Sequence, residues 1–195
     1  MNASAMKSAL FIPILMLALA GCASPARIDA MTAVPSAQLP TTSLLYQSVS
    51  VNNISGGSST NPMWKSNVGN PEFQSALQNS LGAAGMLASS SGRYRLDAIL
   101  NELDQPLFGL DMSVSSTVHY TLTDTTNSKQ AFDQSITASY TATMSDAFVG
   151  VERLRLANEG SIKKNIASFL DQLRAQFGKP PVVSQINATT IPFGG

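Results

Sequence analysis

The clearest pattern in the chain is an alternation of apolar and hydroxyl-bearing residues over positions 112–144. The first half, MSVSSTVHYTLTD, places four apolar residues on one face: Val114, Val118, Tyr120 and Leu122. After the turn sequence TTNSKQ the second half does the same: Ile136, Ala138, Tyr140, Ala142 and Met144. A period of two is typical of half-buried strands. The pattern predicts a hairpin with one apolar and one hydroxyl-rich face.

Two more segments have strand character. Residues 44–51, LLYQSVSV, are rich in β-formers, with Leu45, Val49 and Val51 on one side. A second strand begins at GRYRLDAILNEL, where four apolar residues alternate with mostly polar ones: Tyr94, Leu96, Ala98 and Leu100.

Two segments change to a helical period. In NPEFQSALQNSLGAAG one stripe contains Phe73, Ala76, Leu77, Leu81 and Ala84. Asn70 is expected to be its N-cap and Gly85 to close it. The second helix lies within residues 151–177, with an apolar stripe of Ile162, Ile166, Phe169, Leu170, Leu173 and Phe177. Gly160 is expected either to kink this helix or to mark its start near Ser161.

The predicted order of elements is β-α-β-β-β-α, which indicates a single α+β domain over residues 43–178. Its sheet is expected to have about four strands, mostly antiparallel, with a right-handed crossover joining the first two strands in parallel. Two helices with one apolar stripe each cover one face, which leaves the hydroxyl-rich face to water or a partner. The tail, 179–195, is predicted to be a short strand or disordered.

The amino terminus has the pattern of a secretory signal. Residues 9–20 are apolar and follow Lys7, and a start at Met6 would be a more typical opening than one at Met1. Twelve residues are too few for a transmembrane helix, which needs about 20. The apolar run leads directly to Cys22, the only cysteine in the chain.

Leu19-Ala20-Gly21-Cys22 resembles the lipobox of bacterial lipoproteins. The resemblance implies that 1–21 is a signal peptide cut before Cys22, and that Cys22 carries diacylglycerol on sulfur and usually an acylated amine. An ordinary signal peptide cut near Ala20 is the alternative. Ala23, where an Asp would resemble an inner-membrane retention signal, favours the outer membrane. The proline-containing residues 22–42 are expected to form the lipidated terminus and a flexible tether.

The order of elements behind a lipobox is similar to that of small proteobacterial envelope lipoproteins. These include the LPS-assembly lipoprotein and the auxiliary lipoproteins of ABC-type lipid-trafficking systems. The resemblance covers residues 43–178 at the level of architecture. It implies a non-enzymatic accessory subunit in envelope assembly or lipid trafficking, with the membrane and an envelope protein as partners.

Composition excludes several other classes of function. Twelve Lys and Arg residues are scattered among twelve Asp and Glu residues, and only 12% of the chain is charged, against about 25% in a usual soluble domain. Nucleic-acid binding is not expected, because it needs a basic face. One cysteine and one histidine exclude a disulfide framework and most metal sites. We expect no cofactor and no metal.

His119 is the residue to test for catalysis, because it lies mid-strand on the hydroxyl-rich face near several serines. An envelope hydrolase is therefore one alternative function, although the chain has no G-x-S-x-G elbow. The densest carboxylates are Asp97, Glu102, Asp104 and Asp111, of which Asp104 and Asp111 are expected to cap a turn.

Apolar residues in predicted loops are the candidates for partner or lipid contact: Met63, Trp64, Leu107, Phe108 and Leu110. Exposed apolar clusters mark contact sites. The other interpretation is that these residues fold back to cap the end of the sheet. A further alternative function, a module that binds a hydrophobic ligand between helices and sheet, requires an apolar cavity of several hundred Å³, in the range of about 300–1,000 Å³.

Overall fold

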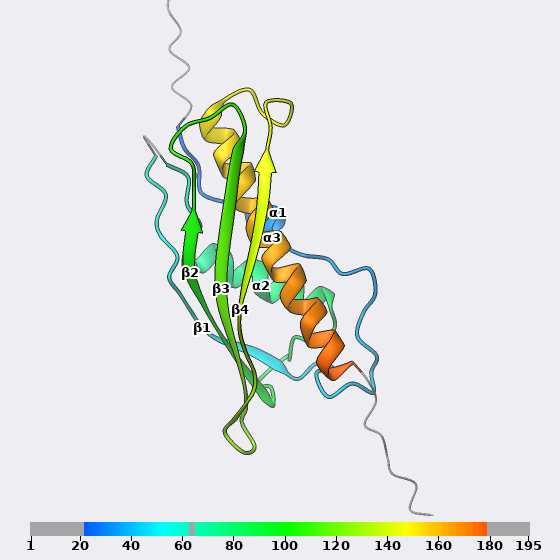
Figure 1. Ribbon diagram of the computed structural model, residues 1–195. Helices are drawn as coiled ribbons and strands as arrows, with labels where there is room; N and C mark the ends of the chain where they lie inside the picture. Colours follow the sequence, from blue (N-terminus) through cyan, green and yellow to red (C-terminus); the bar gives the residue numbers. More distant parts are fainter. Residues whose placement is uncertain (1–21, 63–64, 179–195) are drawn as a thin grey trace, which may run out of the picture.

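The computed structural model describes residues 22–62 and 65–178, so the expected signal peptide, the tail and the pair Met63 and Trp64 lie outside it. The described elements follow the predicted order, with one short helix added in front (Figure 1). They are α1 Ile28–Met31, β1 Val49–Ser55, α2 Asn70–Ala83, β2 Tyr94–Asp104, β3 Met112–Asp124, β4 Lys129–Ala142 and α3 Gly150–Phe177.

The four strands form one sheet in the order β1-β2-β3-β4. β1 pairs with β2 in parallel, and α2 supplies the crossover between them. β2 with β3 and β3 with β4 are antiparallel, and in the predicted hairpin Val118 lies opposite Ile136. The predicted fold class is confirmed, with a mixed sheet.

The core lies between the sheet and the helices, where α3 packs on β3 and β4 and α2 packs against β1. The predicted stripe of α2 is fully buried. Phe169 of α3 stacks on Tyr120 of β3 with ring centroids 4.0 Å apart, and meets the edge of Phe132 of β4 at 5.5 Å. Such aromatic pairs add stability beyond the area that they bury.

Two local predictions are corrected and a third is confirmed. β1 begins at Val49 and not at Leu44, because residues before it form turns that include Gln47 at a φ of 47°. The N-cap of α2 is Gly69, whereas the side chain of Asn70 accepts a hydrogen bond from the Gly57 amide at 2.7 Å. Gly85 closes α2 as predicted, with a φ of 75°.

Gly160 neither starts nor ends a helix, since α3 runs unbroken from Gly150 to Phe177. Its role is steric: a Cβ at this position would lie closer than 3.0 Å to the ring of Tyr140 on β4. The missing side chain lets the helix approach the strand.

Residues 22–42 do not form the expected flexible tether. Met31, Ala33 and Leu39 are buried, and α1 packs against α2 and α3. The Ala33 amide donates to the Ser80 hydroxyl and the Leu39 amide donates to the Ala84 carbonyl, both at 2.9 Å. The apolar residues scattered among the prolines are thus held by the two long helices.

Candidate functional site

Cys22 has an exposed thiol, and the chain is fixed to the domain immediately after it. The Ala23 amide donates to the Pro62 carbonyl at 2.8 Å, and the Ser66 hydroxyl donates to the Ser24 carbonyl at 2.7 Å. In Figure 1 the dark-blue start of the described chain lies at the end of the molecule where β2 connects to β3. Cys22 therefore occupies a defined place on the surface.

Three of the predicted contact residues lie in the connection between β2 and β3 and are exposed to solvent. Leu107 is 90% exposed, Phe108 86% and Leu110 73%. Phe148, in the connection between β4 and α3 at the same end, is 85% exposed. We call these four side chains the apolar tip. They project into solvent, so the interpretation that the residues of the β2–β3 connection fold back to cap the sheet is wrong.

Arg153 holds the two loops of the apolar tip together. It is buried in the first turn of α3 and donates from Nη1 to the carbonyls of Ala147 and Phe148, at 2.8 and 2.7 Å. Its Nη2 makes a longer contact of 3.5 Å with the Gly109 carbonyl, and its Nε has no partner among the described residues. A buried charge needs such acceptors, because desolvation is costly without them.

A buried polar cluster connects the start of the chain to the base of the tip. The Ser66 carbonyl accepts from Gln105 Nε2 and from Asn158 Nδ2, both at 2.9 Å. Gln105 Nε2 also donates to Asn158 Oδ1 at 2.6 Å. Since the Ser66 hydroxyl also donates to the Ser24 carbonyl, two hydrogen bonds through Ser66 connect the segment after Cys22 to Gln105, where the β2–β3 connection begins.

An ion pair fixes the same segment to α3. The Arg27 backbone amide, Nε and Nη2 donate to the carboxylate of Glu159, at 2.8, 3.1 and 3.0 Å. Arg155 lies 3.6 Å from the same carboxylate. Hydrogen bonding and attraction to Glu159 raise the pKa of Arg27 above its ordinary value. The ion pair joins distant chain segments, and Arg27 and Glu159 also line a surface groove of about 520 Å³.

The hydroxyl-rich face of β3 and β4 consists of directly opposed polar pairs. Thr117 and Thr137 lie 2.9 Å apart, and the hydroxyl of Ser139 donates to Ser115 at 3.1 Å. His119 contacts Ser135 through Nδ1 at 3.0 Å and Asp133 through Nε2 at 2.8 Å. The structure thus brings a serine, a histidine and an aspartate together, as the hydrolase alternative requires.

This trio lies in the middle of two strands on the open face of the sheet. Ser135 is not on a turn or at a helix start, where the amides of an oxyanion hole are usually found. A groove of about 420 Å³ on the described surface lies elsewhere and is lined by residues that include Ala23 and Gly57. The trio at His119 therefore lacks the turn or helix start that usually supplies oxyanion donors.

The predicted carboxylates do not converge. Asp97 accepts from Asn52 Nδ2 at 2.6 Å and from the Asn53 amide at 3.1 Å, where β1 bulges. Glu102 is exposed on β2. The expected turn caps are not found, since Asp104 and Asp111 make no side-chain hydrogen bond within the described chain. The described residues contain no cluster of potential metal ligands.

Two important residues, Phe148 of the apolar tip and Arg153 behind it, are absent from the sequence predictions. Phe148 has the same signal as Phe108, an aromatic residue in a connection, although the stretch DAFVG borders the last helix. Arg153 has no such signal, because its partners are backbone carbonyls: those of Ala147 and Phe148 just before α3, and that of Gly109 in the β2–β3 connection.

Comparison with known proteins places the fold. No family model matches the chain, and no curated protein matches it. Among solved structures, protein XCC0632 from Xanthomonas campestris, described as DUF330, superposes with a TM-score of 0.55 at 8% identity, over 78% of this chain and 96% of that one. The chain shares the fold of this Xanthomonas protein.

Two further structures are similar at lower scores. A candidate lipoprotein from Caulobacter crescentus has a TM-score of 0.47 at 13% identity, covering 67% of this chain and 90% of that one. A minor lipoprotein from Acinetobacter baumannii has a TM-score of 0.44 at 14% identity, covering 67% and 94%. Within residues 22–62 and 65–178, no helix combines the length and apolar composition needed to cross a membrane.

Proposed function

We propose that this chain is a lipid-anchored lipoprotein of the bacterial outer membrane that faces the periplasm. It acts there as a non-enzymatic accessory subunit in envelope assembly or lipid trafficking. The carrying observation is Cys22, whose exposed thiol directly follows the lipobox-like residues 19–21. The structures similar in fold include proteins described as lipoproteins, which supports the same assignment.

Acylation explains the lone thiol chemically. An exposed free cysteine oxidises in the periplasm, whereas a thioether does not form disulfides. Two or three acyl chains bind a membrane stably, because each buried methylene contributes about 0.8 kcal/mol. The anchor then takes the place of a transmembrane helix.

A protein partner has two surfaces available, the hydroxyl-rich face and the outer edge of β1 after Val49. The amide and carbonyl of Val49 itself are already bonded to Met86 and Ala88. The outer edge of β4 is less suited to strand addition, because α3 covers two of its carbonyls. Lys164 Nζ donates to the Ser139 carbonyl at 3.2 Å and Gln176 Nε2 donates to the Ala131 carbonyl at 2.9 Å. Edges protected in this way resist pairing with another chain.

The core packing disfavours the hydrophobic-ligand alternative. That function needs an apolar cavity between helices and sheet. In the structure this space is filled by the aromatic stack of Tyr120, Phe132 and Phe169 together with the buried leucines of α2.

The anchor is tested by Cys22→Ser in the full-length chain expressed in a proteobacterial host. We expect loss of labelling by a clickable fatty acid and release of the protein from membranes into the soluble periplasmic fraction. The measurement is in-gel fluorescence after labelling, together with membrane flotation. Wild type should float with the outer-membrane fraction.

The matched control moves the thiol. Cys22→Ser combined with Ser59→Cys keeps one exposed cysteine but places it away from the lipobox, so it should remain unlabelled. Membrane retention of Cys22→Ser at the wild-type level would contradict the lipoprotein assignment. Activity is tested separately: His119→Ala should leave the cellular role intact, and a loss equal to that of Cys22→Ser would favour a hydrolase.

A further inference from the structure

Cys22 and the apolar tip lie at the same end of the molecule (Figure 1). Hydrogen bonds connect the two: Ser66 bonds to Ser24, two residues after Cys22, and to Gln105, two residues before Leu107 of the tip. Building on the proposed lipid anchor, we infer that the apolar tip inserts into the lipid surface that holds Cys22, so that the domain rests on the membrane through this end.

The first argument is that the chain after Cys22 is not flexible enough to hold the domain away from the membrane. A flexible tether of 20 residues would let the domain stand about 25 Å from the membrane on average. The structure replaces that tether with a packed segment, in which Ala23 is already hydrogen-bonded and buried and Arg27 is paired with Glu159. A bilayer that holds the acyl chains of Cys22 must therefore lie against the surface around Cys22.

The second argument is that the side chains of the apolar tip are hydrophobic and exposed. Its four side chains are leucine and phenylalanine, each 73% or more exposed. Burying such side chains in lipid is favourable, since the apolar area is removed from water. Exposed apolar groups on two neighbouring loops are the arrangement expected at a contact surface.

The charges around the tip are compatible with shallow insertion. The guanidinium of Arg153 is buried behind the tip and neutralises no lipid phosphate, because it donates to loop carbonyls. Asp146 accepts from the Thr143 amide at 2.7 Å, which lowers the pKa of its carboxyl, so it remains ionised at the level of the polar headgroups. The chain has no net charge. Insertion is thus apolar, and does not depend on anionic lipid.

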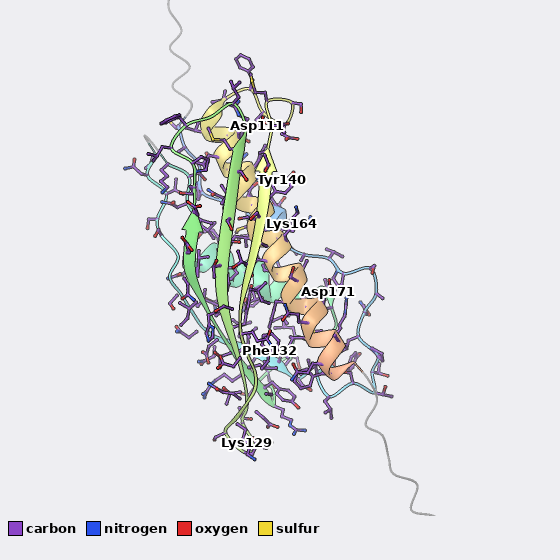
Figure 2. All side chains as sticks on the ribbon, viewed as in Figure 1. Asp111, Lys129, Phe132, Tyr140, Lys164 and Asp171 are labelled. Atoms are coloured by element: carbon purple, nitrogen blue, oxygen red, sulfur yellow. The ribbon has the colours of Figure 1, made fainter. Side chains whose placement is uncertain are left out.

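The inference also orients the molecule. Asp111, beside the tip, and Lys129, at the β3–β4 turn, lie at opposite ends of the long hairpin (Figure 2). With the tip in the membrane, the β3–β4 turn points away from it. The hydroxyl-rich face then stands upright and open to the periplasm.

The test uses the acylated full chain, purified from membranes and reconstituted into phosphatidylcholine–phosphatidylethanolamine vesicles. Because Cys22 is the only cysteine and is then a thioether, Phe108→Cys or Phe148→Cys provides a single thiol for an environment-sensitive fluorophore. Gln130→Cys, exposed at the far end of the hairpin, is the matched control. Nitroxide-labelled lipids report contact with the acyl region.

We expect quenching by nitroxide lipids at Phe108→Cys and Phe148→Cys to exceed that at Gln130→Cys by about twofold or more, as for groups about 5–10 Å into the interface. Added phosphatidylglycerol should leave this difference unchanged. Equal quenching at all three positions, in protein that is acylated and bound to vesicles, would overturn this inference but not the proposed anchor.

Two other outcomes also decide the matter. In the first, the emission of the tip probe shifts to the blue without quenching by nitroxide lipids, and the shift grows with the protein-to-lipid ratio. This result would show that a second copy of this chain covers the tip, and would overturn lipid insertion. Protein whose mass lacks acyl chains and which fails to float would overturn the proposed anchor, and the inference with it.

Discussion

At the scale of single residues, Asp124 illustrates how one carboxylate closes the central hairpin. It accepts from Arg93 Nη2 at 2.7 Å and from the amide and hydroxyl of Thr126 at 3.0 and 2.7 Å. These bonds hold the pKa of the Asp124 carboxyl well below its ordinary value, with Arg93 as the main cause. The aspartate therefore stabilises the fold only while it is ionised.

This sets the sign of a pH dependence. The folded pKa lies below the unfolded one, so the contribution of Asp124 is fully present above about pH 4 and is lost as the pH falls toward the folded value. We expect Asp124→Asn to lower the free energy of unfolding at neutral pH and to flatten its acid dependence below about pH 4. Urea melts at several pH values measure both effects.

The control for this prediction is Asp171→Asn on α3, where the carboxylate is 76% exposed and lies 3.8 Å from Arg174. Surface pairs of this kind contribute little, about 0–1 kcal/mol. Equal acid dependence in the two variants would show that Asp124 is not the group responsible.

At the scale of elements, the contact of α3 with β4 depends on Gly160 opposite Tyr140. The ring of Tyr140 lies against the helix backbone, and Lys164 lies 5.2 Å from the ring centroid. The helix thereby reaches the edge strand and covers its carbonyls, as described for Lys164 and Gln176. A residue that ordinarily weakens a helix is needed here for packing.

A double-mutant cycle separates the two effects of Gly160→Ala. In the wild-type background the new methyl meets the Tyr140 ring, so we expect destabilisation of about 1–3 kcal/mol from overpacking. In a Tyr140→Ala background the same change should stabilise the protein by up to about 1 kcal/mol, because alanine is the better helix former. Chemical denaturation measures all four variants, and the same effect of Gly160→Ala in both backgrounds would contradict the contact.

At the scale of the whole molecule, the segment that follows Cys22 is part of the folded domain. Its buried residues are held by α2 and α3, and its ion pair joins Arg27 to Glu159, 132 positions away in sequence. The residues next to Cys22 and the folded body therefore move as one unit, which distinguishes this chain from a domain on a flexible tether.

Met31→Ala tests this integration. Met31 is fully buried in α1, so we expect the free energy of unfolding to fall by about 2–5 kcal/mol. The matched control is Val34→Ala in the same segment, where the side chain is 74% exposed and the effect should stay within about 0.5 kcal/mol. A neutral Met31→Ala would restore the tether interpretation.

Regular periodicity made most of the fold predictable. The alternation over 112–124 matched β3 residue for residue, and the stripe of α2 matched its buried side. Each of these elements buries one continuous face, and a regular hydrophobic period in the sequence indicates such a face. The predicted start of β1 was too early, because the apolar residues Leu44 and Leu45 lie in a turn but resemble the start of a strand.

Features that depend on distant partners could not be predicted. Asn165 of α3 is polar, yet it is buried, donates to the carbonyls of Ser116 and Ile136, and accepts from the Tyr120 hydroxyl. Arg153 and Glu159 are buried for similar reasons. Of the candidate site, the exposed loop residues could be named from their apolar character, but their proximity to Cys22 required the packing of residues 22–42.

That packing has a consequence for the order of events during synthesis. The surfaces that receive residues 22–42 include α3, which is the last described element to emerge, so the contact of Arg27 with Glu159 forms only after most of the chain has been made. Contacts of such long sequence separation form late. Under the proposed function, an enzyme that acts on Cys22 before α3 has been made would meet an extended peptide and not a folded surface.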